Sequence, residues 1–171
     1  MKKRNPSPAA AHASPRRWGR AQEDQIVDPY RWTHKPGEPA VCPQCGAVYQ
    51  DGRWSWAKRP STALQITCQA CHRINDRYPA GVVNLAGPRL AALKTQILQL
   101  ARHQEEAEGK EHPLNRIMGV QEGTEGLVIN TTDIHLPRRI GEAVQRAYKG
   151  ELKIHFDESG YFVRVDWTSP A

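Results

Sequence analysis

The sequence lacks any run of eighteen apolar residues, so it predicts no helix that crosses a membrane. Its basic first residues are not followed by an apolar stretch, and we therefore expect no secretory signal. Common enzyme signatures are missing as well: there is no glycine-rich phosphate loop, no H-E-x-x-H and no nucleophile elbow. These absences favour a cytoplasmic protein that is not an enzyme.

Apolar residues are scarce, at 39% of the 171 residues, whereas Gly and Pro contribute 13 residues each. This composition suits one domain, or two small ones, with a large share of loop. Cysteine is scarce too, with four residues in the chain. In a chain without a secretory signal, four cysteines indicate metal or redox chemistry and not a disulfide framework.

Acidic residues are absent from residues 1–20, although this segment holds six cations: Lys2, Lys3, Arg4, Arg16, Arg17 and Arg20. The whole chain carries +6, so residues 21–171 have no net charge. A basic N-terminal segment is typical of nucleic-acid binding, and a solvated tail is the alternative. Residues 1–38 have no sustained hydrophobic period, which predicts a disordered basic arm. Trp18, Tyr30 and Trp32 are exceptions that either anchor the arm or stack on a partner.

The cysteines form two C-x2-C pairs, Cys42 with Cys45 and Cys68 with Cys71. Zn²⁺ prefers four tetrahedral ligands, and a β-hairpin predicted around Asp51-Gly52 brings the two pairs together. In this hairpin Tyr49 lies opposite Trp54. We therefore expect a zinc ribbon over residues 39–77 with one structural Zn²⁺, because four thiolates leave no open coordination position.

Other interpretations of the cysteines exist. An iron–sulfur cluster uses the same four thiolates and remains open. Cys68 to His72 match the haem-attachment pattern C-x-x-C-H, but covalent haem attachment normally requires export. A thioredoxin-like redox pair needs a βαβ setting, which the predicted hairpin contradicts.

The rest of the chain predicts an α+β fold: the four-cysteine zinc ribbon, a long connecting helix and a ββαββ antiparallel-sheet domain. Residues 78–113 are expected to form a loop and an amphipathic helix, with its apolar stripe at Leu90, Leu93, Ile97 and Leu100 and a solvated charged tip at 104–111. Residues 114–168 predict strands at 117–121 and 126–131, a helix at about 137–149, and two strands of period 2. Thr132 and Asp133 are expected to cap the helix.

Twelve residues are candidates for RNA contact because they are basic or aromatic: Arg16, Arg17, Arg20, Arg53, Trp54, Trp56, Lys58, Arg59, Arg73, Arg77, Arg138 and Arg139. Trp54 and Trp56 form either a base-stacking platform or the small core of the ribbon. Arg138 and Arg139 lie in the first turn of the predicted helix, where their charge opposes the helix dipole. Such a position suggests phosphate contact, with ordinary surface arginines as the alternative.

The cysteine module carries a resemblance in the runs Val41-Cys42-Pro43-Gln44-Cys45-Gly46-Ala47-Val48-Tyr49, Trp54-Ser55-Trp56, Cys68-Gln69-Ala70-Cys71-His72-Arg73-Ile74 and Tyr78-Pro79-Ala80-Gly81. These runs resemble a group of short bacterial zinc-ribbon proteins over residues 40–168. They also resemble the N-terminal zinc-binding part of the archaeal and eukaryotic large-ribosomal-subunit export adaptor, which was first named for nonsense-mediated decay. That adaptor family has more cysteine pairs, so its multi-zinc arrangement does not transfer.

The resemblance implies that Cys42, Cys45, Cys68 and Cys71 are metal ligands, and that ribosomal RNA or a ribosomal protein is the partner. We therefore expect a zinc-ribbon RNA-binding protein, associated with ribosomes or ribosomal precursors. The alternative is a protein–protein interaction or regulatory adaptor module that uses the amphipathic helix. An accessory subunit of an enzyme is a third possibility.

Overall fold

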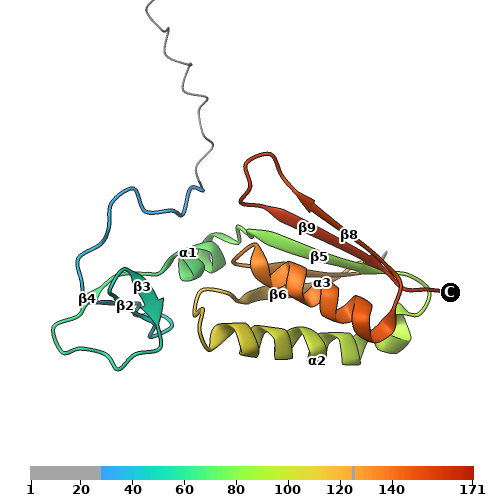
Figure 1. The fold of residues 1–171 in the computed structure, drawn as a ribbon, viewed down its shortest axis with the longest axis horizontal. Helices are drawn as coiled ribbons and strands as arrows, with labels where there is room; N and C mark the ends of the chain where they lie inside the picture. The colour runs from blue at the N-terminus through green and yellow to red at the C-terminus, as the bar shows by residue number, and fades with distance from the viewer. Residues whose placement is uncertain (1–27, 125) are drawn as a thin grey trace, which may run out of the picture.

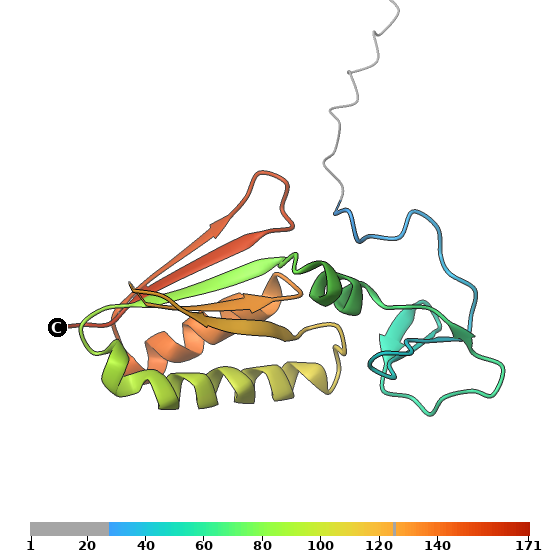
Figure 2. The same cartoon turned by 180° about the vertical axis from the view of Figure 1, so that it is seen from behind.

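The computed structural model describes residues 28–124 and 126–171. It has an α+β fold, as the sequence predicts, with a small sheet beside the four cysteines and a larger sheet covered by helices (Figure 1). Helix α1 (Gln69–Asp76) lies between these two parts in both views (Figures 1 and 2). Within the described ranges, no helix is long and apolar enough to cross a membrane.

The small sheet has the strand order β3-β2-β1-β4, with β1 at Ala40–Val41, β2 at Val48–Gln50, β3 at Arg53–Ser55 and β4 at Leu64–Gln65. The predicted hairpin is confirmed: Asp51 and Gly52 have φ values of 54° and 76°, and Tyr49 pairs with Trp54. Positive φ at both turn positions matches the right-handed twist of the strands. Helix α1, which follows directly from Cys68, was not predicted from the sequence.

The larger sheet has the strand order β6-β7-β5-β9-β8. Its elements follow the chain as β5 (Gly81–Ala86), α2 (Leu90–Gly109), β6 (Ile117–Glu122), β7 (Leu127–Thr131), α3 (His135–Tyr148), β8 (Glu151–Phe156) and β9 (Val163–Thr168). The central strand β5 pairs antiparallel with β7 and parallel with β9. Helices α2 and α3 cover one face of this sheet (Figures 1 and 2).

The predicted ββαββ arrangement is wrong, because strand β5 is also part of the sheet. The sheet has five strands and is mixed, and the helix assigned as a connector is part of the same domain. A boundary at residues 113/114 would separate the sheet from its own central strand. Residues 78–86 were expected to be a loop before the helix; the segment is short and has turn residues on both sides, at Pro79 and at Gly87-Pro88. Tertiary pairing on both sides overrides that local signal.

The main core lies between the large sheet and the two helices, and it includes Val83, Leu85, Ile129, Val165 and Trp167. The stripe of α2 packs against this core: Ile97 is fully buried, and Leu90, Leu93 and Leu100 are partly buried. The charged tip of the helix is not fully solvated, because Glu108 is only 8% exposed and pairs with Arg139. Helix α2 therefore buries its apolar face inside the protein.

Residues 28–38 lie against the ribbon, whereas the sequence analysis assigned them to a disordered arm. The ring of Trp32 packs at 5.3 Å from that of Tyr49 and at 5.7 Å from that of Trp54. Tyr30 donates a hydrogen bond to Asp76 in α1 at 2.7 Å. Tyr30 and Trp32 are therefore anchors, and the rest of the predicted arm, residues 1–27, lies outside the described residues.

Candidate metal centre

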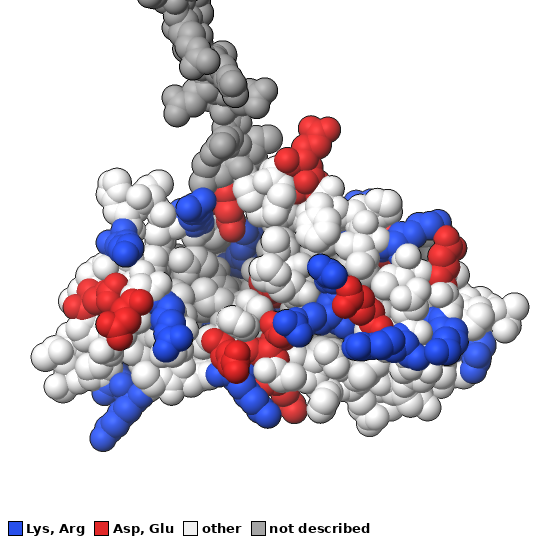
Figure 3. All heavy atoms as spheres, in the orientation of Figure 1, with Lys and Arg blue, Asp and Glu red and all other residues white. Residues whose placement is uncertain are grey.

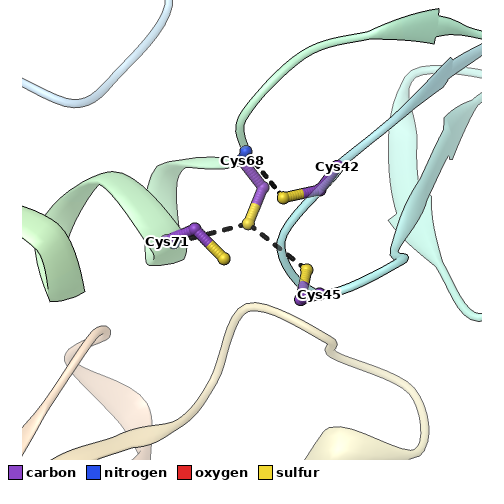
Figure 4. Close-up of side chains that lie close together, drawn as sticks. All are labelled: Cys42, Cys45, Cys68 and Cys71. Atoms are coloured by element: carbon purple, nitrogen blue, oxygen red, sulfur yellow. Dashed lines mark hydrogen bonds between the residues drawn. The ribbon is translucent and has the colours of Figure 1, made fainter.

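The fold brings the side chains of the four cysteines together. Cys42 and Cys45 flank the turn after β1, whereas Cys68 precedes α1 and Cys71 lies in its first turn (Figure 4). All four sulfur atoms lie within 4.8 Å of one another, and no disulfide joins them. The predicted convergence of the two C-x2-C pairs is therefore confirmed.

The geometry fits a tetrahedral metal ion. A tetrahedron with metal–sulfur bonds of about 2.3 Å has sulfur–sulfur edges of about 3.8 Å. The Sγ atoms of Cys45 and Cys68 are 3.8 Å apart. Backbone N–H groups already point at the sulfurs: Cys68 N donates to Cys42 Sγ, and Cys71 N donates to Cys68 Sγ, both at 3.4 Å. These are the donors that thiolates require.

The site is largely shielded from solvent, since Cys42, Cys68 and Cys71 are buried and Cys45 is partly buried. Burial raises the pKa of the Cys68 and Cys71 thiols. Burial acts in the same direction on Cys42, but backbone N–H donors, with Cys68 first among them, bring its pKa down to about 7. A metal ion must therefore displace protons from this cluster, which makes metal binding weaker at lower pH.

Arg116 lies against the cysteines and was not predicted from the sequence. Its Nη2 atom donates to Cys45 Sγ at 3.1 Å and to Cys68 Sγ at 3.6 Å, and its Nη1 donates to Cys71 Sγ at 3.5 Å. Arg116 precedes β6 in the large sheet, 45 residues after Cys71. No motif spacing could have found it, because only the tertiary fold brings it to the cysteines.

Two of the candidate RNA-contacting residues are buried, which corrects their assignment. Trp54 is 9% exposed, packs against Tyr49, and donates its indole N–H to Gln69 Oε1 at 3.0 Å. Arg73 is 3% exposed and pairs with Asp28 at 2.6 Å. Because both side chains are already packed and bonded, Trp54 belongs to the core of the ribbon and Arg73 to the anchor of residues 28–30.

The remaining described candidates are exposed: Arg53, Trp56, Lys58, Arg59, Arg77, Arg138 and Arg139. The side chain of Trp56 is 49% exposed. Arg138 and Arg139 are each ion-paired at 2.7 Å, with Glu142 and Glu108 respectively. Arg16, Arg17 and Arg20 lie outside the described residues.

Charged residues do not form a patch of a single sign on the face drawn in Figure 3, where Lys and Arg alternate with Asp and Glu.

Asp133 accepts hydrogen bonds from the backbone N–H groups of His135 and Leu136, at 2.7 and 2.9 Å, which confirms its predicted role as a helix cap. Thr132 instead bonds to the segment before β6, donating to Leu114 O and accepting from Arg116 N.

No protein-family model matches the chain, and no significant match was found among curated proteins or solved structures. The resemblance to zinc-ribbon proteins therefore stays a prediction from the sequence. The four-cysteine cluster is the feature from which a function can be argued.

Proposed function

We propose that the chain is a cytoplasmic, non-catalytic RNA-binding protein, associated with ribosomes or ribosomal precursors, in which one structural Zn²⁺ holds the ribbon together. The observation that carries the proposal is the closed four-cysteine cluster, on a module whose hairpin and following loop expose Arg53, Trp56, Lys58 and Arg59.

The donor set favours Zn²⁺. Four thiolates within 4.8 Å of one another are typical of structural zinc sites, and four such ligands leave no position for a water or a substrate. The module is small: besides three cysteines, its buried cluster contains five residues, Ala40, Ala47, Tyr49, Trp54 and Ala70. A core of this size contributes too little stability for the module to fold alone, so metal coordination supplies stability that packing does not.

The exposed residues of the ribbon suit RNA. Trp56 offers an aromatic face, and base–aromatic stacking contributes about 1–3 kcal/mol per base. Arg53, Lys58 and Arg59 lie close to it in sequence, and all three are exposed. The six cations of residues 1–20 add further positive charge. Together they supply the phosphate and base contacts that single-stranded RNA needs.

The alternative, a protein–protein interaction or regulatory adaptor module that uses the amphipathic helix, is less well supported. It requires the apolar stripe of α2 to be available to a partner, but Ile97 is fully buried and Leu90, Leu93 and Leu100 pack against the protein's own core. A helix that covers its own sheet offers a partner only its polar side. We therefore favour RNA over a protein docked on α2.

Metal analysis of the purified protein tests the first part of the proposal. We expect one zinc per chain, whereas iron with visible absorbance would assign an iron–sulfur cluster. The absence of any metal would remove the structural centre from the proposal.

RNA binding is tested by measuring affinity for single-stranded RNA against salt concentration, together with sedimentation of the protein with ribosomes at low and high salt. Each phosphate contact contributes about 0.7–0.9 to the slope of log K against log salt. A chain starting at Ala21 loses six cations, so its slope should be smaller by up to about four or five. Replacing the six cations with Gln at full length should give the same reduction and separates charge from chain length.

The ribbon surface is tested by the double variant Arg53→Gln/Arg59→Gln. A matched control, Arg102→Gln/Arg146→Gln, removes the same charge from exposed positions on α2 and α3. We expect the ribbon variant to bind RNA more weakly than the control. Equal affinities for the two variants would place RNA binding elsewhere, and no binding by the full-length protein would refute the RNA proposal.

A further inference from the structure

We infer that Arg116 is a positioning residue of the metal centre, which neutralises thiolate charge and joins the large sheet to the ribbon. This inference rests on the metal site proposed above and concerns a residue outside the cysteine motif. Its basis is the group of three N–H···S contacts that the guanidinium makes to Cys45, Cys68 and Cys71, at 3.1, 3.6 and 3.5 Å.

The guanidinium is held in place before any metal arrives. Its Nε donates to Pro113 O at 2.6 Å, which leaves the two Nη atoms directed at the sulfurs. The backbone of Arg116 is fixed on both sides by Thr132: its N–H donates to Thr132 Oγ1 at 2.9 Å, and its carbonyl accepts from Thr132 N at 3.0 Å. Thr132 is buried and follows the end of β7. A donor anchored in this way keeps its geometry without a further loss of side-chain freedom.

Charge favours the contact. A divalent ion with four thiolates carries a net charge of −2, and a buried charge without a partner is costly. In the part of the chain that the structure describes, no lysine and no other arginine donates a hydrogen bond to these sulfurs. The planar fork of arginine reaches several sulfurs at once, which the single ammonium of lysine cannot do.

The same contacts affect the electronic state of the sulfurs. An N–H donor stabilises the lone pairs of a thiolate, so more energy is needed to move an electron from sulfur to the metal. Partners of metal ligands typically change metal affinity 10- to 100-fold when they are removed. Arg116 should therefore increase metal affinity and shift the charge-transfer absorption of a bound metal.

The test compares the wild-type protein with Arg116→Met, Arg116→Lys and the control Arg146→Met. Arg146 is also an arginine of the large sheet domain, at an exposed position on α3. Zn²⁺ affinity is measured by competition with a chelator, and the thiolate-to-metal absorption band is measured after loading with Co²⁺. Circular dichroism establishes that each variant retains its fold.

For Arg116→Met we expect zinc affinity to fall by about 10- to 100-fold and the Co²⁺ charge-transfer band to move to longer wavelength. Arg116→Lys should lie between this variant and the wild type, and Arg146→Met should match the wild type. A general packing defect would lower affinity without moving the band, and that result would overturn the inference. Unchanged affinity and an unchanged band in Arg116→Met would overturn it too. If the wild-type protein binds no zinc, the metal proposal itself fails.

Discussion

A chain that begins at Asn115 should fail to fold, because it lacks the central strand of the large sheet. Removing residues 1–114 eliminates β5, which pairs with both β7 and β9, and α2, which covers the sheet. The two remaining hairpins, β6–β7 and β8–β9, have no strand between them. This expectation reverses the one that follows from the sequence, in which residues 114–168 form a domain of their own.

The loss can be estimated from three side chains. Val83 and Leu85 in β5 and Ile97 in α2 are at most 1% exposed. Burying each such side chain contributes about 1.5–3 kcal/mol, so the three together contribute about 5–9 kcal/mol. A small domain is stable by only about 5–15 kcal/mol in total. The shortened chain therefore has little or no stability left, even before the lost hydrogen bonds of β5 are counted.

Urea unfolding of two fragments, followed by circular dichroism and by the fluorescence of Trp167, measures this effect. Trp167 is a suitable reporter because it is buried in the core that the deletion opens. A matched fragment that starts at Tyr78 keeps β5 and α2 and should unfold in one cooperative transition. The fragment from Asn115 should show no transition. A cooperative transition in the shorter fragment would refute the argument that β5 is essential to the sheet.

Three further outcomes are expected. Cys68→Ser removes one ligand and should abolish zinc binding and unfold the ribbon, because structural zinc contributes about 10–16 kcal/mol. NMR signals of the large sheet should remain dispersed, and retained zinc would contradict this expectation. Gly141→Ala should destabilise the protein by about 1–3 kcal/mol in urea unfolding, since the new Cβ would lie 2.5 Å from Val165 Cγ1. Unchanged stability would mean that α3 moves away from β9 at no cost. Burial raises the pKa of Asp133 above 3.8, so protonation favours the folded state and stability falls as the pH rises from 3.8 through the folded pKa. Asp133→Asn keeps a capping side chain without charge and should equal or exceed the wild type at pH 7, with the difference shrinking below pH 4, whereas Asp133→Ala should lose about 1 kcal/mol.

Local patterns in the sequence determined several parts of this protein. The Asp51-Gly52 turn predicts its hairpin because few residues accept positive φ at two successive positions. The two C-x2-C pairs and the hairpin between them predict the convergence of the four cysteines, since the hairpin folds the chain back on itself. Alternation along β8 and β9 and the apolar face of α3 predict elements within a few residues of those observed. In each case the information lies in short segments of the chain: a turn, a strand, a helix or a C-x2-C pair.

Only the tertiary structure decided the features that depend on contacts between distant segments. The segment 81–86 becomes the central strand because β7 and β9 pair with it on both sides, although its own sequence is short and flanked by turn residues. The sequence left Trp54 between a stacking platform and the core of the ribbon and placed Arg73 on the surface, but the packing of residues 28–32 on the ribbon buries both. Arg116 reaches the cysteines only because Thr132 and Pro113 hold it there. Sequence spacing encodes neighbours along the chain, whereas these contacts depend on how segments that are far apart in the chain pack together.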